Sequence, residues 1–180
     1  ARPSRVVLVA HDFAPKLGGM ETVARSLARE LLARGVEVKV YTTKRLGARI
    51  ASGLGDGAVV PLYTPLAPPG RIDLRPDLHL TIDRALRDVP DVIHLCNAGL
   101  GPWIPDLRAA LPATVTCSVH GNDLLAPWVT SGDEPAAYRA AQIAGLSAAD
   151  AVIAVSEFSR RLAETNGVDR RALHTVENGV

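Results

Sequence analysis

Hydrophobic positions along the first 42 residues follow two different periods. Residues 5–10 (RVVLVA) form a continuous apolar run of strand length, as in a buried parallel strand. In residues 20–34, apolar side chains recur every four positions and arginines lie between them. This pattern predicts an amphipathic helix that ends at Gly35. Residues 36–42 (VEVKVYT) alternate and predict a second strand. The three segments form a βαβ unit, whose two strands are parallel.

The rest of the chain continues this alternation after one interruption. Residues 44–75 contain many glycines and prolines, which predict mostly loop with a short strand near residues 58–63. The following periodicity predicts helices over residues 76–87, 102–111, 134–147 and 157–166, and strands over residues 91–96, 113–119, 151–155 and 172–177. Six or seven strands that alternate with helices predict an α/β fold, a doubly wound parallel sheet of Rossmann-like type.

Composition narrows the class of protein. The chain has 180 residues, of which 47% are hydrophobic, enough for one domain with a full core. Its net charge of +1 gives no reason to expect a nucleic-acid partner. Cys96 and Cys117 each end an apolar run, so we expect buried thiols in a reducing cytoplasm rather than a disulfide. No apolar stretch reaches about 18 residues, so no transmembrane segment is expected.

The best candidates for a functional site are polar residues directly after the predicted strands. In a doubly wound sheet, ligands bind beyond the carboxyl ends of the strands. Asp12, Asn97, His120, Asn122 and Asp123 all occupy such positions. A histidine at a strand end is also a common structural hydrogen-bonding residue, and turn carboxylates are often only solvated. The histidines lack partners at metal-ligand spacing, so we expect no metal site.

Residues 16–22 (KLGGMET) place two glycines where the first helix begins. Bare backbone at Gly18 and Gly19 would let a phosphate approach the unpaired amide groups of the helix N-terminus. The alternative is a tight turn that needs a positive φ. The dinucleotide fingerprint GxGxxG and the GK[ST] of a P-loop are both absent from this segment.

Four stretches together resemble the N-terminal half of a GT-B fold glycosyltransferase of the retaining family 4 type. In chain order they are APKLGGMETVARSLARELLARGVEVKVYT, DVIHLCNAG, TCSVHGND and ADAVIAVSEFSRRLAETNGVDRRALHTVENGV. Each motif is weak alone, but the four occur in the family's order over nearly the whole chain. One departure is Val36, where the family often has His.

The resemblance implies roles for several residues. It implies that Gly18 and Gly19 approach the diphosphate of a nucleotide-sugar donor, and that His120 approaches the transferred sugar. It also implies that this half of the fold chiefly binds the acceptor. The acceptor-binding candidates are Asp12, Asn97, Asn122, Asp123 and Trp128, with loops 44–75 and 97–101 around them. The family's E-x7-E motif is absent from the 180 residues.

The resulting hypothesis is a single N-terminal, acceptor-binding domain of a retaining, metal-independent glycosyltransferase. A C-terminal donor-binding domain would complete it, and no cofactor beyond the nucleotide sugar is expected. Residues 1–180 alone are expected to be inactive and to self-associate through the lost interdomain face. Two alternatives remain at this stage: a non-catalytic sugar- or partner-binding module, and another doubly wound enzyme such as a sugar-nucleotide epimerase. The residues that follow position 180 in the parent protein would distinguish them.

Overall fold

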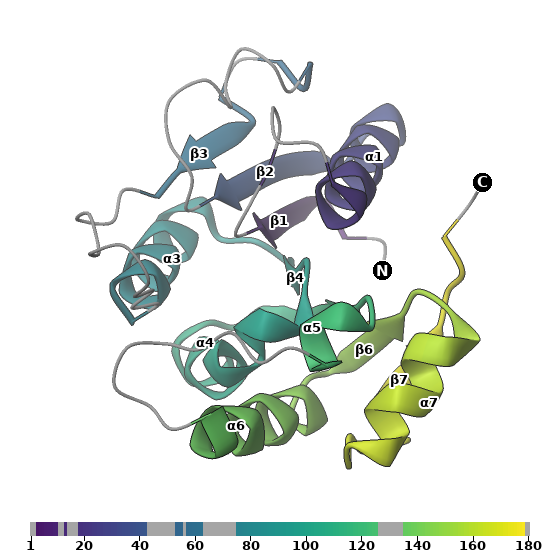
Figure 1. The fold of residues 1–180 in the computed structure, drawn as a ribbon. Coiled ribbons are helices and arrows are strands. Elements are labelled where there is room, and N and C mark those ends of the chain that lie inside the picture. The colour runs from purple at the N-terminus through teal and green to yellow at the C-terminus, as the bar shows by residue number, and fades with distance from the viewer. Residues whose placement is uncertain are drawn as a thin grey trace.

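The computed structural model describes residues 3–10, 13, 18–42, 53–55, 57–62, 75–125 and 135–178. In these residues one seven-stranded sheet runs in the order β3-β2-β1-β4-β5-β6-β7, and all its strand pairs are parallel. The strands are β1 (Arg5–Ala10), β2 (Glu37–Thr42), β3 (Val59–Pro61), β4 (Val92–Leu95), β5 (Thr114–Val119), β6 (Ala151–Ala154) and β7 (Leu173–Thr175). The predicted α/β doubly wound sheet is confirmed (Figure 1).

The helices follow the predicted periodicity with two differences. They are α1 (Gly19–Ala33), α3 (Arg75–Asp88), α4 (Ile104–Ala110), α5 (Asn122–Leu125), α6 (Pro135–Ser147) and α7 (Glu157–Thr165), with the 3₁₀ helix η1 (Ala98–Trp103) before α4. The sequence predicted one helix over residues 102–111, whereas the chain turns earlier, at Ala98. It did not predict α5, because four residues are too few to display a helical period.

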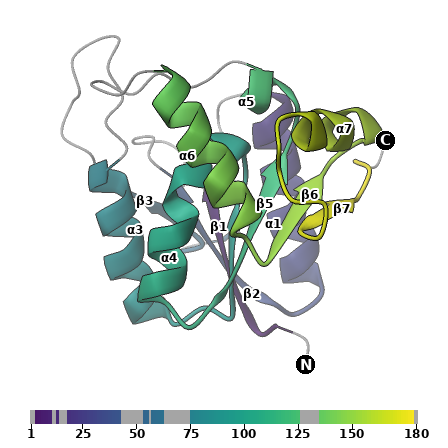
Figure 2. The same cartoon turned by 90° about the horizontal axis from the view of Figure 1, so that it is seen from below.

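Helices cover the two faces of the sheet unequally. Helices α3, α4, α6 and α7 pack on one face, here named the α4 face, and α1 packs on the other, named the α1 face. Figure 2 shows α3, α4 and α6 in front of the sheet and α1 behind it. The α1-face core joins the apolar side of α1, including the fully buried Ala28, to Leu8 of β1 and Val40 of β2. Beyond β1 the described part of this face carries no second helix.

Apolar and polar side chains alternate along β5, so one face of this strand is apolar and the other is polar. Val115, Cys117 and Val119 are fully buried in the core of the α4 face. The intervening Thr116 and Ser118 point to the α1 face, because successive side chains of a strand lie on opposite sides. The two cysteines are free and buried, as expected. Cys117 belongs to the α4-face core, whereas Cys96 belongs to the α1-face core.

Segment 97–101 lies deeper than the sequence suggested. Residues 98–101 are buried against α6, which approaches them backbone to backbone. A Cβ atom on Gly145 would lie 2.7 Å from the carbonyl carbon of Gly101, so neither helix tolerates a side chain there. The packing of α6 therefore fixes the chain that follows β4. None of the described helices is long and apolar enough to cross a lipid bilayer.

Candidate functional site

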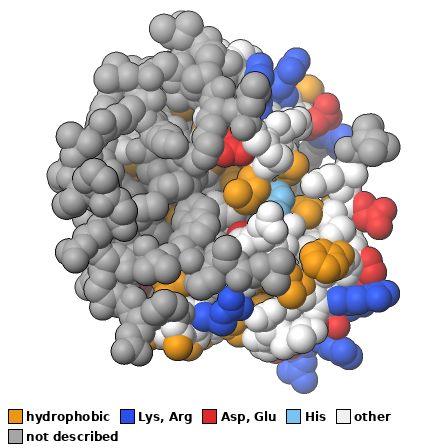
Figure 3. All heavy atoms as spheres, in the orientation of Figure 1, with side chains coloured by type: hydrophobic (Ala, Val, Ile, Leu, Met, Phe, Trp, Pro, Cys, Tyr) orange, Lys and Arg blue, Asp and Glu red, His pale blue; other side chains and the backbone are white. Residues whose placement is uncertain are grey.

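The candidate site lies where the strand order reverses. Strand β1 pairs with β2 on one side and with β4 on the other. The connection after β1 therefore leads toward one edge of the sheet, and the connection after β4 leads toward the other edge. Ligands of doubly wound sheets bind in the crevice at this switch point. The N-terminus of α1, which follows β1, and His120, which follows β5, both belong to this edge. In the space-filling view, a His side chain reaches the surface between hydrophobic side chains (Figure 3).

The His120 side chain is half-buried and tied to the neighbouring strand end. Its Nε2 atom lies 3.0 Å from the carbonyl oxygen of Cys96, which follows β4. A carbonyl oxygen only accepts hydrogen bonds, so Nε2 carries the proton and donates it. Nδ1 has no hydrogen-bond partner among the described residues. In the neutral ring Nδ1 is therefore an acceptor available to a hydroxyl group.

The Asp123 carboxylate organises the backbone around His120. It is 2% exposed and accepts hydrogen bonds from three backbone amides. These amides belong to Ala98 at 2.8 Å, Gly121 at 2.9 Å, and His120 at 3.1 Å. The carboxylate thus joins the start of η1 to the turn after β5. Its contacts are internal, and its predicted role in acceptor binding stays a prediction.

The buried amide side chains of Gln142 and Asn97 lie close to this turn. Gln142 of α6 is fully buried, and its Nε2 donates to the carbonyls of Ala98 and Asp123 at 3.0 and 2.8 Å. Asn97 is 4% exposed, and its Oδ1 has no hydrogen-bond partner among the residues that the structure describes. Asn122, by contrast, is exposed at the start of α5. A buried acceptor without a donor is costly, and Asn97 Oδ1 is itself enclosed, so its predicted role in acceptor binding stays a prediction.

The two glycines at the start of α1 have different surroundings. Gly18 is the N-cap with φ −174° and ψ 165°, an extended conformation open to any residue. A Cβ atom on Gly18 would lie 3.0 Å from Cδ of Glu21 and would collide with its carboxylate. Gly19 is exposed, and a Cβ atom there would meet nothing within 4 Å. Neither glycine has a positive φ, so the tight-turn alternative is wrong.

Glu21 gives the N-terminus of α1 an acidic neighbour that the sequence analysis overlooked. Its side chain is 6% exposed and folds back over Gly18 in the first turn of the helix. A carboxylate there is stabilised by the partial positive charge of the helix end. The bare backbone at Gly18 therefore makes room for Glu21, while the open side of the helix end lies at Gly19.

A polar ladder on the α1 face includes a histidine from within the predicted strand 91–96. His94 of β4 is 8% exposed, and its Nδ1 and Nε2 lie 2.8 and 2.9 Å from the hydroxyls of Thr116 and Ser118. Burial, reinforced by the charge of His120, lowers the pKa of His94 to about 4. His94 is therefore neutral near pH 7. Polar residues at alternate positions along 116–120 were the sequence signal for this ladder.

His94 and Ser118 of this ladder line a groove beside α1. The groove has a volume of about 520 Å³. Its walls are Thr22, Val23, Ser26, Leu27 and Glu30 of α1, Ile153 and Val155 at β6, and residues 176–178 after β7. The groove exists because α1 is the one described helix on this face of the sheet.

The remaining predicted positions, a second tryptophan and two further histidines lie in different surroundings. Asp12, Trp128 and most of loop 44–75 lie outside the described residues. Trp103 is 3% exposed within the core of the α4 face, where it packs rather than binds. His79 and His174 are exposed. Within the described ranges no group of three or more His, Cys, Asp or Glu side chains is arranged to hold a metal ion.

Comparison with known proteins identifies the family. The family model described as Glycosyltransferase Family 4 matches residues 17–180. The chain belongs to glycosyltransferase family 4. The matched segment contains the glycine pair, the polar ladder and His120, so the site described above lies within the family domain. A search of curated protein sequences gave no match.

Solved structures of glycosyltransferases share the fold at low sequence identity. Anabaena HepE, solved in complex with UDP-glucose, is 17% identical with a TM-score of 0.68 over 98% of this chain. Sucrose-phosphate synthase from Thermosynechococcus elongatus is 17% identical with a TM-score of 0.72 over 98%. The lipopolysaccharide outer core galactosyltransferase WaaB, solved without ligand, is 13% identical with a TM-score of 0.66 over 98%. These matches confirm one Rossmann-like half of the GT-B fold.

The family 4 chain described here spans less than half the length of these three proteins. It covers 44% of HepE, 46% of WaaB and 48% of the sucrose-phosphate synthase chain.

Proposed function

We propose that this domain is the acceptor-side half of a retaining, metal-independent glycosyltransferase that uses a nucleotide-sugar donor. A second, donor-binding domain would follow it and close the cleft. The observation that carries the proposal is His120, held by its Nε2 against the Cys96 carbonyl with Nδ1 left for a ligand. The family match and the UDP-glucose in the HepE structure support a nucleotide-sugar donor.

The N-terminus of α1 would stabilise the leaving diphosphate. The first amides of a helix have no intrahelical partner, and together they carry about half a positive charge. The open side at Gly19 leaves space for a phosphate oxygen, whereas Glu21 occupies the side at Gly18. Cations from the second domain would offset the charge of Glu21 and of the diphosphate. Preorganised donors aimed at developing negative charge lower the barrier to transfer.

His120 would orient the transferred sugar for front-face attack. Nδ1 accepts a hydrogen bond from a sugar hydroxyl, because the single proton of the neutral ring is already donated from Nε2 to Cys96. The acceptor hydroxyl would then attack on the face that the diphosphate leaves, which retains the configuration. Asn97 and Asn122 border the same edge as acceptor contacts, and Asp12 and Trp128 are proposed from the sequence alone.

Product analysis tests the proposal. The full-length protein and residues 1–180 are each incubated with a panel of UDP-, GDP- and ADP-sugars and candidate acceptors, with EDTA present. We expect the full-length protein to transfer the sugar with retained configuration, and residues 1–180 to give no product, because half a cleft cannot position two substrates. Transfer by residues 1–180, inversion, or complete loss of transfer in EDTA would contradict the corresponding part of the proposal.

A further inference from the structure

We propose that Phe158 contacts the ring of a cyclic sugar acceptor beside His120, an inference that rests on the proposed function. Phe158 is 64% exposed, the highest exposure among the large hydrophobic side chains of the described residues. It belongs to the first turn of α7, which follows β6 at the carboxyl edge of the sheet. The same edge carries His120 at the end of β5.

The phenyl ring lies against the turn that presents His120. A Cβ atom built on Gly121 would lie 3.5 Å from Cε1 and 3.8 Å from Cδ1 of Phe158, so one edge of the ring covers this glycine. Gly121 has φ +107°, a conformation that favours glycine, and its missing side chain lets the ring approach. The rest of the ring is exposed, and the glycine that it covers directly follows His120 in the chain.

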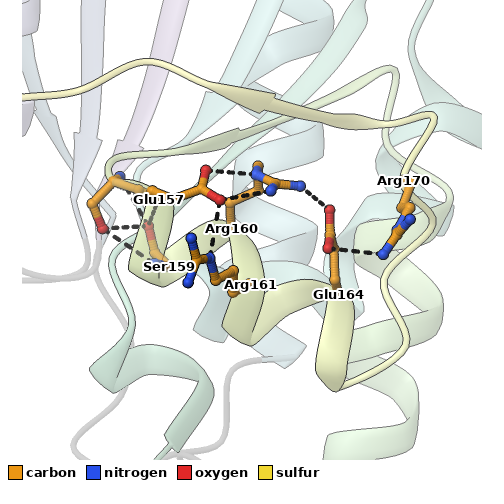
Figure 4. A network of polar contacts seen from close by, with 7 residues as sticks. Glu157, Ser159, Arg160, Arg161, Glu164 and Arg170 are labelled. Carbon is orange, nitrogen blue, oxygen red and sulfur yellow. Dashed lines mark hydrogen bonds and ion pairs between the residues drawn. The ribbon is translucent and has the colours of Figure 1, made fainter.

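The first turn of α7 holds Phe158 in place. Ser156 caps the helix in a capping box with Ser159, whose amide donates to the Ser156 hydroxyl at 3.1 Å. On the outer side Glu157 contacts Arg160 at 2.6 Å and Arg161 at 3.1 Å (Figure 4). Arg160 also pairs with Glu164, which contacts Arg170. The backbone that carries Phe158 is thus fixed before a ligand binds, which lowers the entropy cost of binding.

The combination of an exposed ring and a hydrogen-bond acceptor suits a pyranose. A pyranose presents hydroxyls at its rim and a patch of C–H groups on its face. Phe158 offers an apolar surface for the C–H face, and His120 Nδ1 accepts from a hydroxyl. The exposed Leu86 lies near the end of α3, which leads into the amino end of β4 at the opposite edge of the sheet, and it serves as a matched control.

Saturation-transfer NMR on the full-length protein tests this contact without any transfer reaction. The probes are the methyl α-glycosides of glucose, galactose and mannose, with sorbitol as the open-chain comparison. We expect saturation of aromatic protein protons to reach the ring C–H protons of at least one glycoside. In Phe158→Ala the affinity should fall about fivefold, while Phe158→Tyr and Leu86→Ala should behave as the wild type.

Two results would overturn the inference: equal affinity in Phe158→Ala, or no glycoside that binds better than sorbitol. Because the residue is exposed, the variant should fold normally, which circular dichroism verifies. If the glycoside binds through Phe158 but the full-length protein transfers no sugar from any donor, the proposed function fails and the sugar contact stands.

Discussion

The Nε2 atom of His120 lies 3.0 Å from the carbonyl oxygen of Cys96, a residue on the neighbouring strand end. Pairing between β4 and β5 ends at Leu95 and Cys117, one residue before Cys96 and three residues before His120. The histidine therefore makes a side-chain contact just where the backbone ladder stops. This contact fixes the tautomer of His120 and leaves one ring nitrogen for a ligand.

Removal of the His120 ring should slow transfer in the full-length enzyme. His120→Ala deletes the acceptor at Nδ1, and the loss of one preorganised contact costs about 2–4 kcal/mol of transition-state stabilisation. Turnover should fall by roughly 30- to 1000-fold, with the fold intact. His79→Ala and His174→Ala, both at exposed positions, are the matched controls. Steady-state kinetics with unchanged turnover in a folded His120→Ala would leave this histidine a structural role only.

The two glycines of α1 should respond differently to alanine. Gly19→Ala adds a methyl group in open space and replaces a poor helix former, so stability should rise by up to about 1 kcal/mol. If a phosphate approaches this position, the KM for the donor should rise at the same time. Gly18→Ala requires the flexible Glu21 carboxylate to move aside, so it should not share the gain in stability expected for Gly19→Ala. Thermal unfolding and donor kinetics measure both effects, and an unchanged donor KM in Gly19→Ala would argue against the phosphate contact.

Loss of the Asp123 carboxylate should destabilise the domain strongly. Asp123→Ala leaves the amides of Ala98, His120 and Gly121 without their acceptor in a buried place. We expect a loss of about 2–4 kcal/mol in the free energy of unfolding, measured by urea denaturation. Asp123→Asn keeps one oxygen acceptor and should recover part of the loss. Asn122→Ala, at an exposed position next to it, should change stability little. A stable Asp123→Ala would show that these amides find other partners.

His94 should make the domain sensitive to moderate acid. The pKa of His94 is about 4 in the folded state because burial disfavours the charged ring, whereas the ordinary value is 6.5. Between pH 6.5 and 4 the unfolded chain binds a proton that the folded chain excludes, so stability falls as the pH falls through this window. The full effect is up to about 3 kcal/mol. In His94→Gln this part of the pH dependence should disappear, whereas His79→Gln should retain it. Urea denaturation at several pH values measures the free energy of unfolding of each variant. If His94→Gln loses as much stability as the wild type between pH 6.5 and 4, His94 is not the source of the acid sensitivity.

Val89 offers a simple stabilising substitution after α3. Its φ of +44° is unfavourable for a β-branched residue, and its side chain is 56% exposed. Val89→Gly relieves the strain at little loss of packing, and we expect a gain of about 1 kcal/mol. Leu86→Gly, also exposed but within the helix, should instead lose about 1 kcal/mol. A lower melting temperature for Val89→Gly would contradict the strain argument.

The sequence by itself determined most of the architecture. Apolar runs such as residues 5–10 and the four-residue period before Gly35 are local signals, so strands, helices and their alternation follow from neighbouring residues. The family motifs also lie within short stretches. The apolar run before His120 predicted a strand, and this placed His120 at the end of that strand.

The tertiary structure determined which hydrogen bonds and contacts the polar side chains make. The contact of His120 with Cys96 joins residues 24 positions apart, and that of Asp123 with Ala98 joins residues 25 apart. Such contacts depend on strand register and on the packing of α6 against η1, which no local pattern encodes. For the same reason the sequence did not indicate that Phe158 of α7 covers Gly121. Local periodicity fixes which elements form, whereas the distances between side chains of different elements are set only when the sheet assembles.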